Sequence, residues 1–185
     1  MDLRIEPTLR AAAKGDQAAW RSLVESYSGR VFGVIYRQCG DRDLAEEITQ
    51  ATFVKVVRKL DGYQEQGRFE SWLFRIAVNR LRDEMRRRKR QATPTDFAAS
   101  PPEAFGWTDE SDQPDRQLEA TEQAARLHAA IAKLPEADRE ILHLRYTAEL
   151  GFKEIAAMLD QPLGTVLARG HRALKKLKTL LEESP

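Results

Sequence analysis

The chain is poor in the side chains that bind metals or form disulfides, with one cysteine and three histidines among 185 residues. A single cysteine, Cys39, excludes an internal disulfide and fits a reducing compartment. His128, His143 and His171 are too dispersed in the sequence to form a metal-ligand pattern. We therefore expect no metal, no cofactor and a cytoplasmic location.

Long hydrophobic runs and the short motifs of common enzyme classes are also missing. No segment approaches the roughly 20 apolar residues of a membrane span, and the N-terminus lacks the apolar core of a signal peptide. The sequence contains no glycine-rich phosphate loop, nucleophile elbow or paired-carboxylate signature. We expect a protein that does not insert into membranes and is not an enzyme.

Basic and acidic residues balance over the whole chain but not within its segments. The chain has 30 basic and 29 acidic residues, for a formal net charge of +1. Residues 75–92 nevertheless carry a net charge of +6, and residues 93–123 carry a net charge of −7. The near-neutral total thus hides a basic segment beside an acidic one, which is the kind of distribution that decides which partners each segment can meet.

The first half of the chain has apolar residues at helical spacing, with no competing strand pattern. Suitable capping and stop residues bound helices over about 16–40, 41–60 and 69–90. We expect these three helices to form one compact bundle. The apolar positions assigned to its interior include Leu23, Val24, Ile48, Val57, Leu73 and Met85.

Helical periodicity disappears between residues 91 and 114, where prolines, small polar residues and acids predict a flexible linker. Phe97, Phe105 and Trp107 are unusual in such a segment, and two interpretations stay open for them: local packing or docking on a partner. Helical pattern returns near residue 115. The predicted division is therefore a helical domain over 1–91, an acidic linker over 92–114 and a second helical domain over 115–185.

The second domain has the pattern of a helix-turn-helix. Pro135 is placed to begin one helix at its first position, and Tyr146 belongs to the expected core of that helix. A short apolar helix follows over 152–159, and a break over 160–164 separates it from a strongly basic helix that Thr165 can help to cap. Two short helices joined at a tight turn, the second with a cationic outer face, are typical of a module that reads the major groove of DNA.

The segment 61–90 places aromatic residues directly before an arginine-rich helix. Aromatic rings can stack on bases while arginines hold phosphates, so this pattern suits single-stranded nucleic acid. The alternative interpretation is that Trp72 and Phe74 are bundle core and that the arginines form a solvated face. The presence of a duplex-reading module in the same chain favours the nucleic-acid interpretation.

Taken together, these motifs resemble the extracytoplasmic-function sigma factors, the small two-domain sigma subunits of bacterial RNA polymerase. The resemblance spans about residues 11–181 and is carried by DLAEEITQATFVKVVRKLDGY, FESWLFRIAVNRLRDEMRRR, LPEADREILHLRY and the helix-turn-helix. It implies an all-α protein with two small helical domains that binds core polymerase and directs promoter-specific initiation. Two alternatives remain, a helix-turn-helix regulator that acts without polymerase docking and a sigma-like adaptor without initiation activity.

The resemblance also implies roles for particular residues and partners. The implied partner is core polymerase with its β′ and β subunits, and the residues that would dock on the coiled coil of its largest subunit, β′, are Asp43, Glu46, Glu47 and Gln50. The alternative interpretation of these residues is a solvated acidic face. Recognition and melting of the minus-ten element, including capture of a flipped base of the non-template strand, fall to Tyr63, Phe69, Trp72, Phe74, Asn79, Arg80, Arg86, Arg87, Arg88 and Arg90. Duplex DNA at the minus-thirty-five element would meet Thr165, Leu167, Ala168, Arg169, His171, Arg172 and Lys175. An anti-sigma factor is a further implied partner.

The helix-turn-helix departs from the pattern of the family it resembles. Leu167 and Ala168 stand where polar residues are common, which removes hydrogen-bonding groups near the groove. Gly170 replaces a large aliphatic residue and should weaken the helix by about 1 kcal/mol relative to alanine. Asp160 replaces the usual turn glycine, which aspartate tolerates because it visits the left-handed region more readily than most residues. We expect an unusual minus-thirty-five preference.

Overall fold

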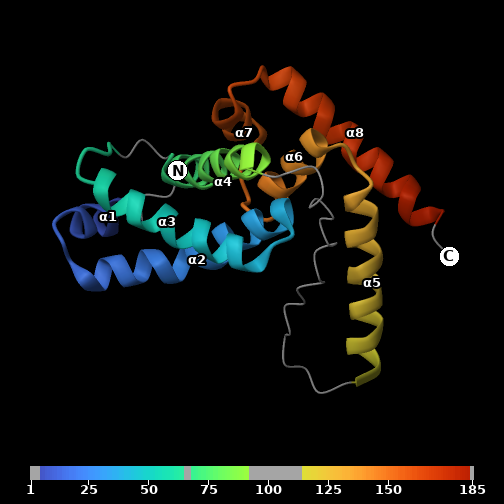
Figure 1. The fold of residues 1–185 in the computed structure, drawn as a ribbon, viewed down its shortest axis with the longest axis horizontal. Helices are drawn as coiled ribbons and strands as arrows, with labels where there is room; N and C mark the ends of the chain where they lie inside the picture. Colours follow the sequence, from blue (N-terminus) through green and yellow to red (C-terminus); the bar gives the residue numbers. More distant parts are fainter. Residues whose placement is uncertain (1–4, 65–67, 92–113, 184–185) are drawn as a thin grey trace.

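A computed structural model describes residues 5–64, 68–91 and 114–183 of the chain, and within these ranges it contains eight α-helices and no strand (Figure 1). This confirms the predicted all-α fold class. The helices are α1 (Ile5–Ala13), α2 (Gln17–Cys39), α3 (Arg42–Lys59), α4 (Phe69–Gln91), α5 (Pro114–Ala132), α6 (Glu136–Tyr146), α7 (Phe152–Leu159) and α8 (Leu163–Glu182). We call α1–α4 the first module and α5–α8 the second module.

The helix ends of the first module follow from local chemistry. The Asp16 carboxylate accepts hydrogen bonds from the N–H groups of Ala18 and Ala19 and so caps α2, which ends at Gly40 in the left-handed conformation with φ 69°. The sequence offers Asp41 or Asp43 to begin α3, and Asp41 caps it by accepting a hydrogen bond from the N–H of Leu44. Helix α1 was not predicted, although it is amphipathic and buries Leu9 and Ala12.

The core is continuous between the two modules. Val31, Ile48 and Leu73 are fully buried in the first module, and they belong to the same hydrophobic cluster as Ile141 and Ile155 of the second. The inner face of the helix-turn-helix therefore packs on the first module, while a smaller cluster between α6 and α8 is separate. The sequence predicts two helical domains separated by a linker, and this prediction does not include a core shared between them.

Four residues assigned to the core by helical spacing are exposed instead. The side chains of Val24, Val57, Met85 and Tyr146 keep relative exposures of 38%, 52%, 37% and 61%. Helical periodicity identifies the apolar side of a helix but not how far its neighbours extend across that side. These assignments were wrong because an apolar residue at the border of a stripe faces solvent wherever no other element covers it.

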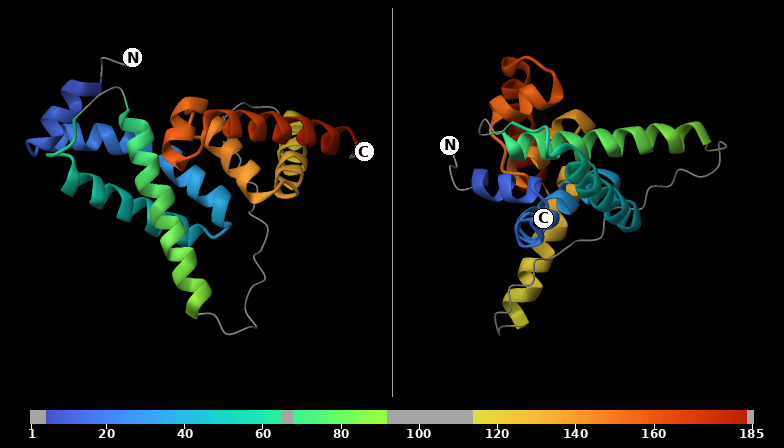
Figure 2. Two further views of the ribbon diagram at one scale, coloured as in Figure 1. Left: turned by 90° about the horizontal axis from the view of Figure 1, so that it is seen from above. Right: turned by 90° about the vertical axis from the view of Figure 1, so that its left-hand side faces the viewer.

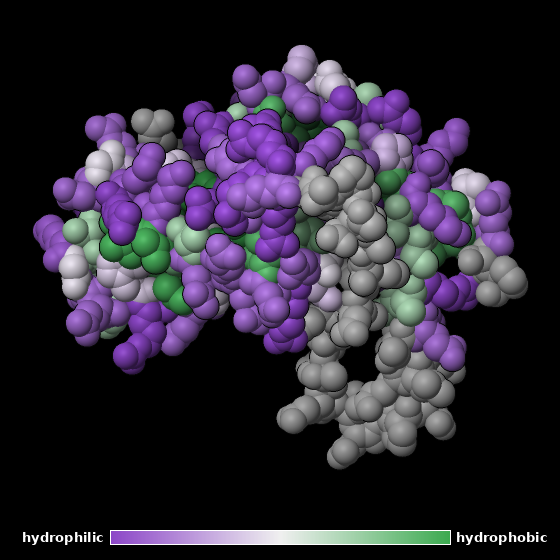
Figure 3. Space-filling model, viewed as in Figure 1, coloured by the Kyte–Doolittle hydropathy of each residue, from purple (hydrophilic) through white to green (hydrophobic). Residues whose placement is uncertain are grey.

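Helix α4 lies between the other helices of the first module and the helix-turn-helix of the second (Figure 2). It contacts α2 and α3 on one side and α7 on the other, and α2 also contacts α6. Figure 1 shows α5 extending away from the rest of the molecule. The surface in that view is largely hydrophilic and carries only separate hydrophobic patches (Figure 3).

The turn between α7 and α8 has the expected chemistry, but α8 and α6 begin at other residues than predicted. Asp160 ends α7 in the left-handed region with φ 54°, as its sequence position suggests. Thr165 does not cap α8, because the helix begins two residues earlier at Leu163 and the N–H of Thr165 already donates to the Pro162 carbonyl. Pro135 precedes α6 instead of occupying its first position. Such one- or two-residue shifts are usual at helix ends, where local rules leave the exact start to tertiary packing.

Candidate nucleic-acid interface

An aromatic cluster stands at the N-terminal end of α4. The Tyr63 and Trp72 rings have centroids 4.5 Å apart, and Trp72 lies 5.9 Å from Phe69. Phe69 in turn contacts Tyr27 edge-on at 5.4 Å, which ties the cluster to α2. Tyr63 and Trp72 are half-buried, so each ring is fixed by packing while part of it remains accessible to a stacking base.

Phe69 and Phe74 do not fit the predicted contact with DNA. Their relative exposures are 3% and 0%, and both rings belong to the core. The guanidinium of Arg30 also covers the Phe74 ring at 5.6 Å. The bundle-core interpretation is therefore correct for Phe74, and Tyr63 and Trp72 are the rings of this predicted set that can reach a base. The sequence could not separate them because it does not show which of these rings the neighbouring helices cover.

Helix α4 presents a polar stripe next to the aromatic cluster. Trp72, Arg75, Asn79 and Arg82 follow one another at intervals of three, four and three residues, which places them on one side of the helix. The Asn79 side chain is exposed and so is that of Arg80 on a neighbouring side. The stacking ring and the amide expected to read a base edge thus share one face of one rigid element.

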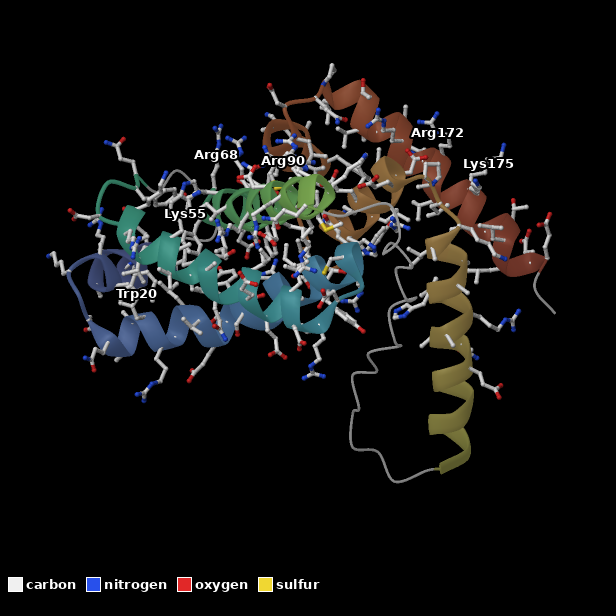
Figure 4. The ribbon with its side chains drawn as sticks, viewed as in Figure 1. Trp20, Lys55, Arg68, Arg90, Arg172 and Lys175 are labelled. Carbon is white, nitrogen blue, oxygen red and sulfur yellow. The ribbon has the colours of Figure 1, made fainter. Side chains whose placement is uncertain are left out.

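The arginine-rich end of α4 is partly engaged by acids of the protein. Glu84 is buried, and Arg87 and Arg88 both donate to it, with distances of 2.7 Å and 3.2 Å for the closest contact of each. The Arg87 guanidinium holds the pKa of Glu84 below its usual value. Arg88 also binds Asp41 at 2.9 Å, which joins the end of α4 to the start of α3. Arg90, labelled in Figure 4, is exposed.

The predicted polymerase-binding residues lie together on α3. Asp43, Glu46, Glu47 and Gln50 are all exposed on turns of the same helix. Arg42 pairs with Glu46 at 3.0 Å, an exposed contact one turn apart that leaves most of the acidic face open. These residues line the outer side of a helix whose opposite side is fully buried, so the element that presents them is rigid.

Helix α8 carries an exposed cationic face. Thr165, Ala168, His171 and Lys175 are exposed, whereas Leu167 and Arg169 are half-buried. Figure 4 shows Arg172 and Lys175 along the outer side of the helix. Arg172 lies 3.4 Å from the buried carboxylate of Asp138, and Arg169 donates to the Gln161 side chain at 3.1 Å, which links it to the turn.

Gly170 has a packing reason that the sequence does not reveal. It is buried, and a Cβ added there would lie 2.8 Å from Cε1 of the Phe152 ring on α7. The glycine therefore allows α7 and α8 to approach closely, at the cost in helix propensity expected for it. The departure from the family pattern at this position is explained by the neighbouring aromatic residue.

The predictions missed a set of arginines that join the two modules. Arg30 donates two hydrogen bonds to Glu70, at 2.8 Å and 3.2 Å, and a third to the Ala148 carbonyl between α6 and α7. Arg75 donates to the Ala157 carbonyl. These contacts, together with the packing of α7 on α4, hold the modules in what we call the closed arrangement.

A third arginine of the closed arrangement, Arg82, binds Glu140 of α6 through both carboxylate oxygens, at 2.8 Å and 3.0 Å. Burial raises the pKa of Glu140, and Arg82 opposes that rise. One sequence signal for such contacts exists. Arg30 falls between Tyr27 and Val34 on the side of α2 that helical spacing assigns to the interior, and a cation there requires a partner.

Three further expectations concern the aromatic residues of the predicted linker, a metal site and a membrane span. Phe97, Phe105 and Trp107 lie outside the described residues. Within the described ranges, no group of three or more His, Cys, Asp or Glu residues is arranged to hold a metal ion. In those same ranges, every helix is too short or too polar to span a bilayer.

Comparison with known proteins assigns both modules. The family model of sigma-70 region 2 matches residues 23–91, and that of sigma-70 region 4 matches residues 130–179. The extracytoplasmic-function (ECF) RNA polymerase sigma factor SigE of Mycolicibacterium smegmatis is 38% identical over 184 residues, covering 95% of this chain and 68% of that protein. The RNA polymerase sigma-H factor of Pseudomonas aeruginosa is 32% identical and covers 92% of each chain.

A solved structure shares the fold. The sigma factor RpoE of Bartonella quintana, crystallised with the anti-sigma factor NepR, superimposes with a TM-score of 0.71 at 22% identity, covering 89% of this chain and 98% of that one. The identities to the curated relatives extend through both modules. The two family models and these relatives together cover the first module and the helix-turn-helix of the second. This chain therefore belongs to the extracytoplasmic-function sigma factors of RNA polymerase.

Proposed function

We propose that the chain binds core RNA polymerase through α3 and holds the promoter at two places, the minus-ten element on α4 and the minus-thirty-five element on α8. The observation that carries this division is the stripe on α4, where the accessible ring of Trp72 and the exposed amide of Asn79 share one side of a rigid helix. A base flipped out of the duplex needs a stacking wall and a group to read its edge, and this stripe offers both.

On the first module, the exposed acids Asp43, Glu46 and Glu47 are the proposed contacts to arginines on the β′ subunit of polymerase, with contributions from the β subunit elsewhere. Complementary charge at such a surface gives orientation and association rate as much as affinity. Arg80, Arg86 and Arg90 would hold phosphates of the melted region. They add affinity and salt dependence without reading sequence.

On the second module, Arg172 and Lys175 would hold the duplex backbone while residues near the start of α8 face the bases. Leu167 and Ala168 offer apolar contact, which suits a thymine methyl group better than a hydrogen-bonding base edge. We expect the preferred minus-thirty-five sequence to differ from the common motif of the family. Reporter transcription from promoters varied at that element measures this directly, and strongest activity from the common motif would overturn it.

The closed arrangement bears on how the chain meets DNA. Arg75 and Arg82, which belong to the same stripe of α4 as Trp72 and Asn79, donate to Ala157 and Glu140 of the second module, and α4 contacts α7. A melted strand that ran along this stripe would meet α7, so we propose that the modules separate when polymerase and promoter are bound. By analogy with the solved relative, an anti-sigma factor would act on the free chain and keep it from polymerase.

The decisive experiment adds the purified chain to sigma-free core polymerase and a promoter template. A sigma factor initiates transcription at the promoter start site in this minimal mixture. A helix-turn-helix regulator would need another sigma factor, and a sigma-like adaptor would block transcription or leave it unchanged. Specific transcripts with the chain, and none without it, are the expected result.

A further inference from the structure

A cavity of about 780 Å³ lies between the two modules and is distinct from the proposed DNA-reading faces. The C-terminal turn of α2 forms one wall, contributing residues from Tyr36 to Gly40. Helices α5, α6 and α8 form the others with apolar side chains such as Leu127, Ile131 and Leu142. Its volume falls in the range of roughly 300–1,000 Å³ that is usual for small-molecule pockets, and its walls are mostly apolar.

The charged groups of this cavity are of one sign. Arg37 and Arg139 line it, whereas none of the described residues that line it is acidic. Arg37 donates to the carbonyl of Gly33 at 3.2 Å, and within the described ranges no carboxylate lies within ion-pair distance of it. Burial lowers the pKa of Arg37, as expected for a cation withdrawn from water without a counter-ion.

Three polar side chains of the cavity wall also have unsatisfied atoms. His143 is only 5% exposed, and its Nε2 lacks a hydrogen-bond partner among the described residues. The same holds for Nδ1 of His128 and Nε2 of Gln38, both of which line the cavity. Burial and the nearby cations Arg37 and Arg139 lower the pKa of His143 to about 3. Buried polar atoms without partners are uncommon and call for an explanation.

We propose that this cavity binds an apolar carboxylate, with the carboxylate next to Arg37 and the hydrocarbon part against α5, α6 and α8. A singly charged anion supplies the missing counter-ion and can accept a hydrogen bond from Nε2 of Gln38, and also from either histidine in the tautomer that carries its proton on the unpartnered nitrogen. A polyphosphate would bring more charge than two arginines can neutralise and would place it against apolar walls. Because α2 forms one wall and the second module forms the rest, the bound molecule joins both modules and favours the closed arrangement.

Binding of decanoate, used below its micellar concentration, tests this on the free full-length chain by isothermal titration calorimetry. We expect saturable binding of one molecule per chain. Arg37→Gln should weaken it about tenfold or more, the usual value of a charge-assisted hydrogen bond. Leu174→Trp places a large ring at a cavity-lining position that is itself 38% exposed, so it should block binding without unfolding the chain.

Lys133→Gln is the matched control, because it removes a cation from an exposed position just beyond α5 that is not part of the cavity wall. Its affinity for decanoate should stay within twofold of the wild type, and decanol should bind about tenfold more weakly than decanoate. Circular dichroism checks that each variant is folded. No saturable binding, or equal weakening by Arg37→Gln and Lys133→Gln, overturns the proposal. The measurement needs no polymerase, so its failure is distinct from failure of the proposed sigma activity.

Discussion

The two modules use their cations in different ways. On the first module, Arg30, Arg82 and Arg88 each bind at least one carboxylate, and Arg30 also satisfies a backbone carbonyl of the other module. On the second, Lys175 and Lys176 are exposed on α8. Arg30, Arg82 and Arg88 are therefore engaged within the protein, whereas on α8 Arg172 pairs with Asp138 and Lys175 stays exposed. Sequence composition alone makes the two basic helices look alike.

The largest effect on initiation should come from Trp72, the accessible ring near the N-terminal end of α4. Trp72→Ala removes a stacking surface worth about 1–3 kcal/mol, so initiation from a duplex promoter should fall by roughly 5- to 150-fold. A template melted in advance should recover part of that loss, because the base no longer has to be captured from the duplex. Abortive transcription with core polymerase measures both. Trp72→Phe keeps a ring and should lose less; equal losses for the two variants would show that stacking is not the role.

Removing a cation that joins the modules should reduce the free energy of unfolding. Arg30→Gln leaves Glu70 without its partner and the Ala148 carbonyl less well satisfied, so we expect a loss of about 2 kcal/mol in urea unfolding. Arg10→Gln is the control, since Arg10 pairs with Glu6 on the exposed surface of α1. Surface pairs of this kind contribute at most about 1 kcal/mol. Equal effects of the two substitutions would contradict the structural role of Arg30.

The buried histidine of the second module should make stability depend on pH. The pKa of His143 is about 3 in the folded chain, because of burial and of the cations Arg37 and Arg139 with His128 nearby, against about 6.5 when unfolded. Between these values the unfolded chain binds the extra proton, so unfolding becomes easier as pH falls. At 1.36 kcal/mol per pH unit, His143 alone should lower the free energy of unfolding by about 2 kcal/mol from pH 7 to pH 5.

Comparing the wild type with His143→Leu isolates this contribution, because carboxylates and His128 titrate in both proteins. Urea unfolding at pH 5, 6 and 7 should show a steeper loss of stability in the wild type. The difference between the two slopes should vanish above pH 7, because His143 is then neutral in both the folded and the unfolded wild type. Parallel pH profiles for the two proteins would mean that His143 is not held neutral by its surroundings.

Two glycines of α8 should respond in opposite directions to the same substitution. Gly170→Ala places a methyl group 2.8 Å from the Phe152 ring and should destabilise the chain by about 1–2 kcal/mol despite the better helix propensity of alanine. Gly164→Ala meets no atom within 4 Å and should stabilise by about 0.5–1 kcal/mol. Thermal unfolding of both variants measures this contrast. A gain in stability from Gly170→Ala would show that α7 and α8 are not in close contact.

The smallest effect should come from a single phosphate contact on α8. Lys175→Ala should weaken binding to duplex promoter DNA similarly for all sequences and reduce the slope of log affinity against log salt by about 1. Fluorescence anisotropy at several salt concentrations measures the slope. Lys14→Ala, at an exposed position between α1 and α2, should leave it unchanged. A change in sequence preference with Lys175→Ala would instead assign this residue a base contact.

Local chemistry in the sequence was sufficient for most helices and for the turn of the helix-turn-helix. Asp16, Gly40 and Asp41 act on atoms within a few residues of themselves, so their effects can be predicted without a fold. The left-handed conformation of Asp160 belongs to the same class. The family resemblance then supplied the proposed functional division, because the motifs that carry it follow one another along the chain in the order expected for that family.

The tertiary structure decided which of these residues remain accessible and which meet across the modules. Phe74 and Trp72 are two residues apart and chemically similar, yet one is fully buried and the other partly open, since only packing distinguishes the two sides of α4. The close approach at Gly170 and the contact of Arg30 with residue 148 join atoms distant in the sequence. Helical periodicity assigns each residue to a side of its own helix, and only the packing of other helices decides whether that side is core, interface or open surface.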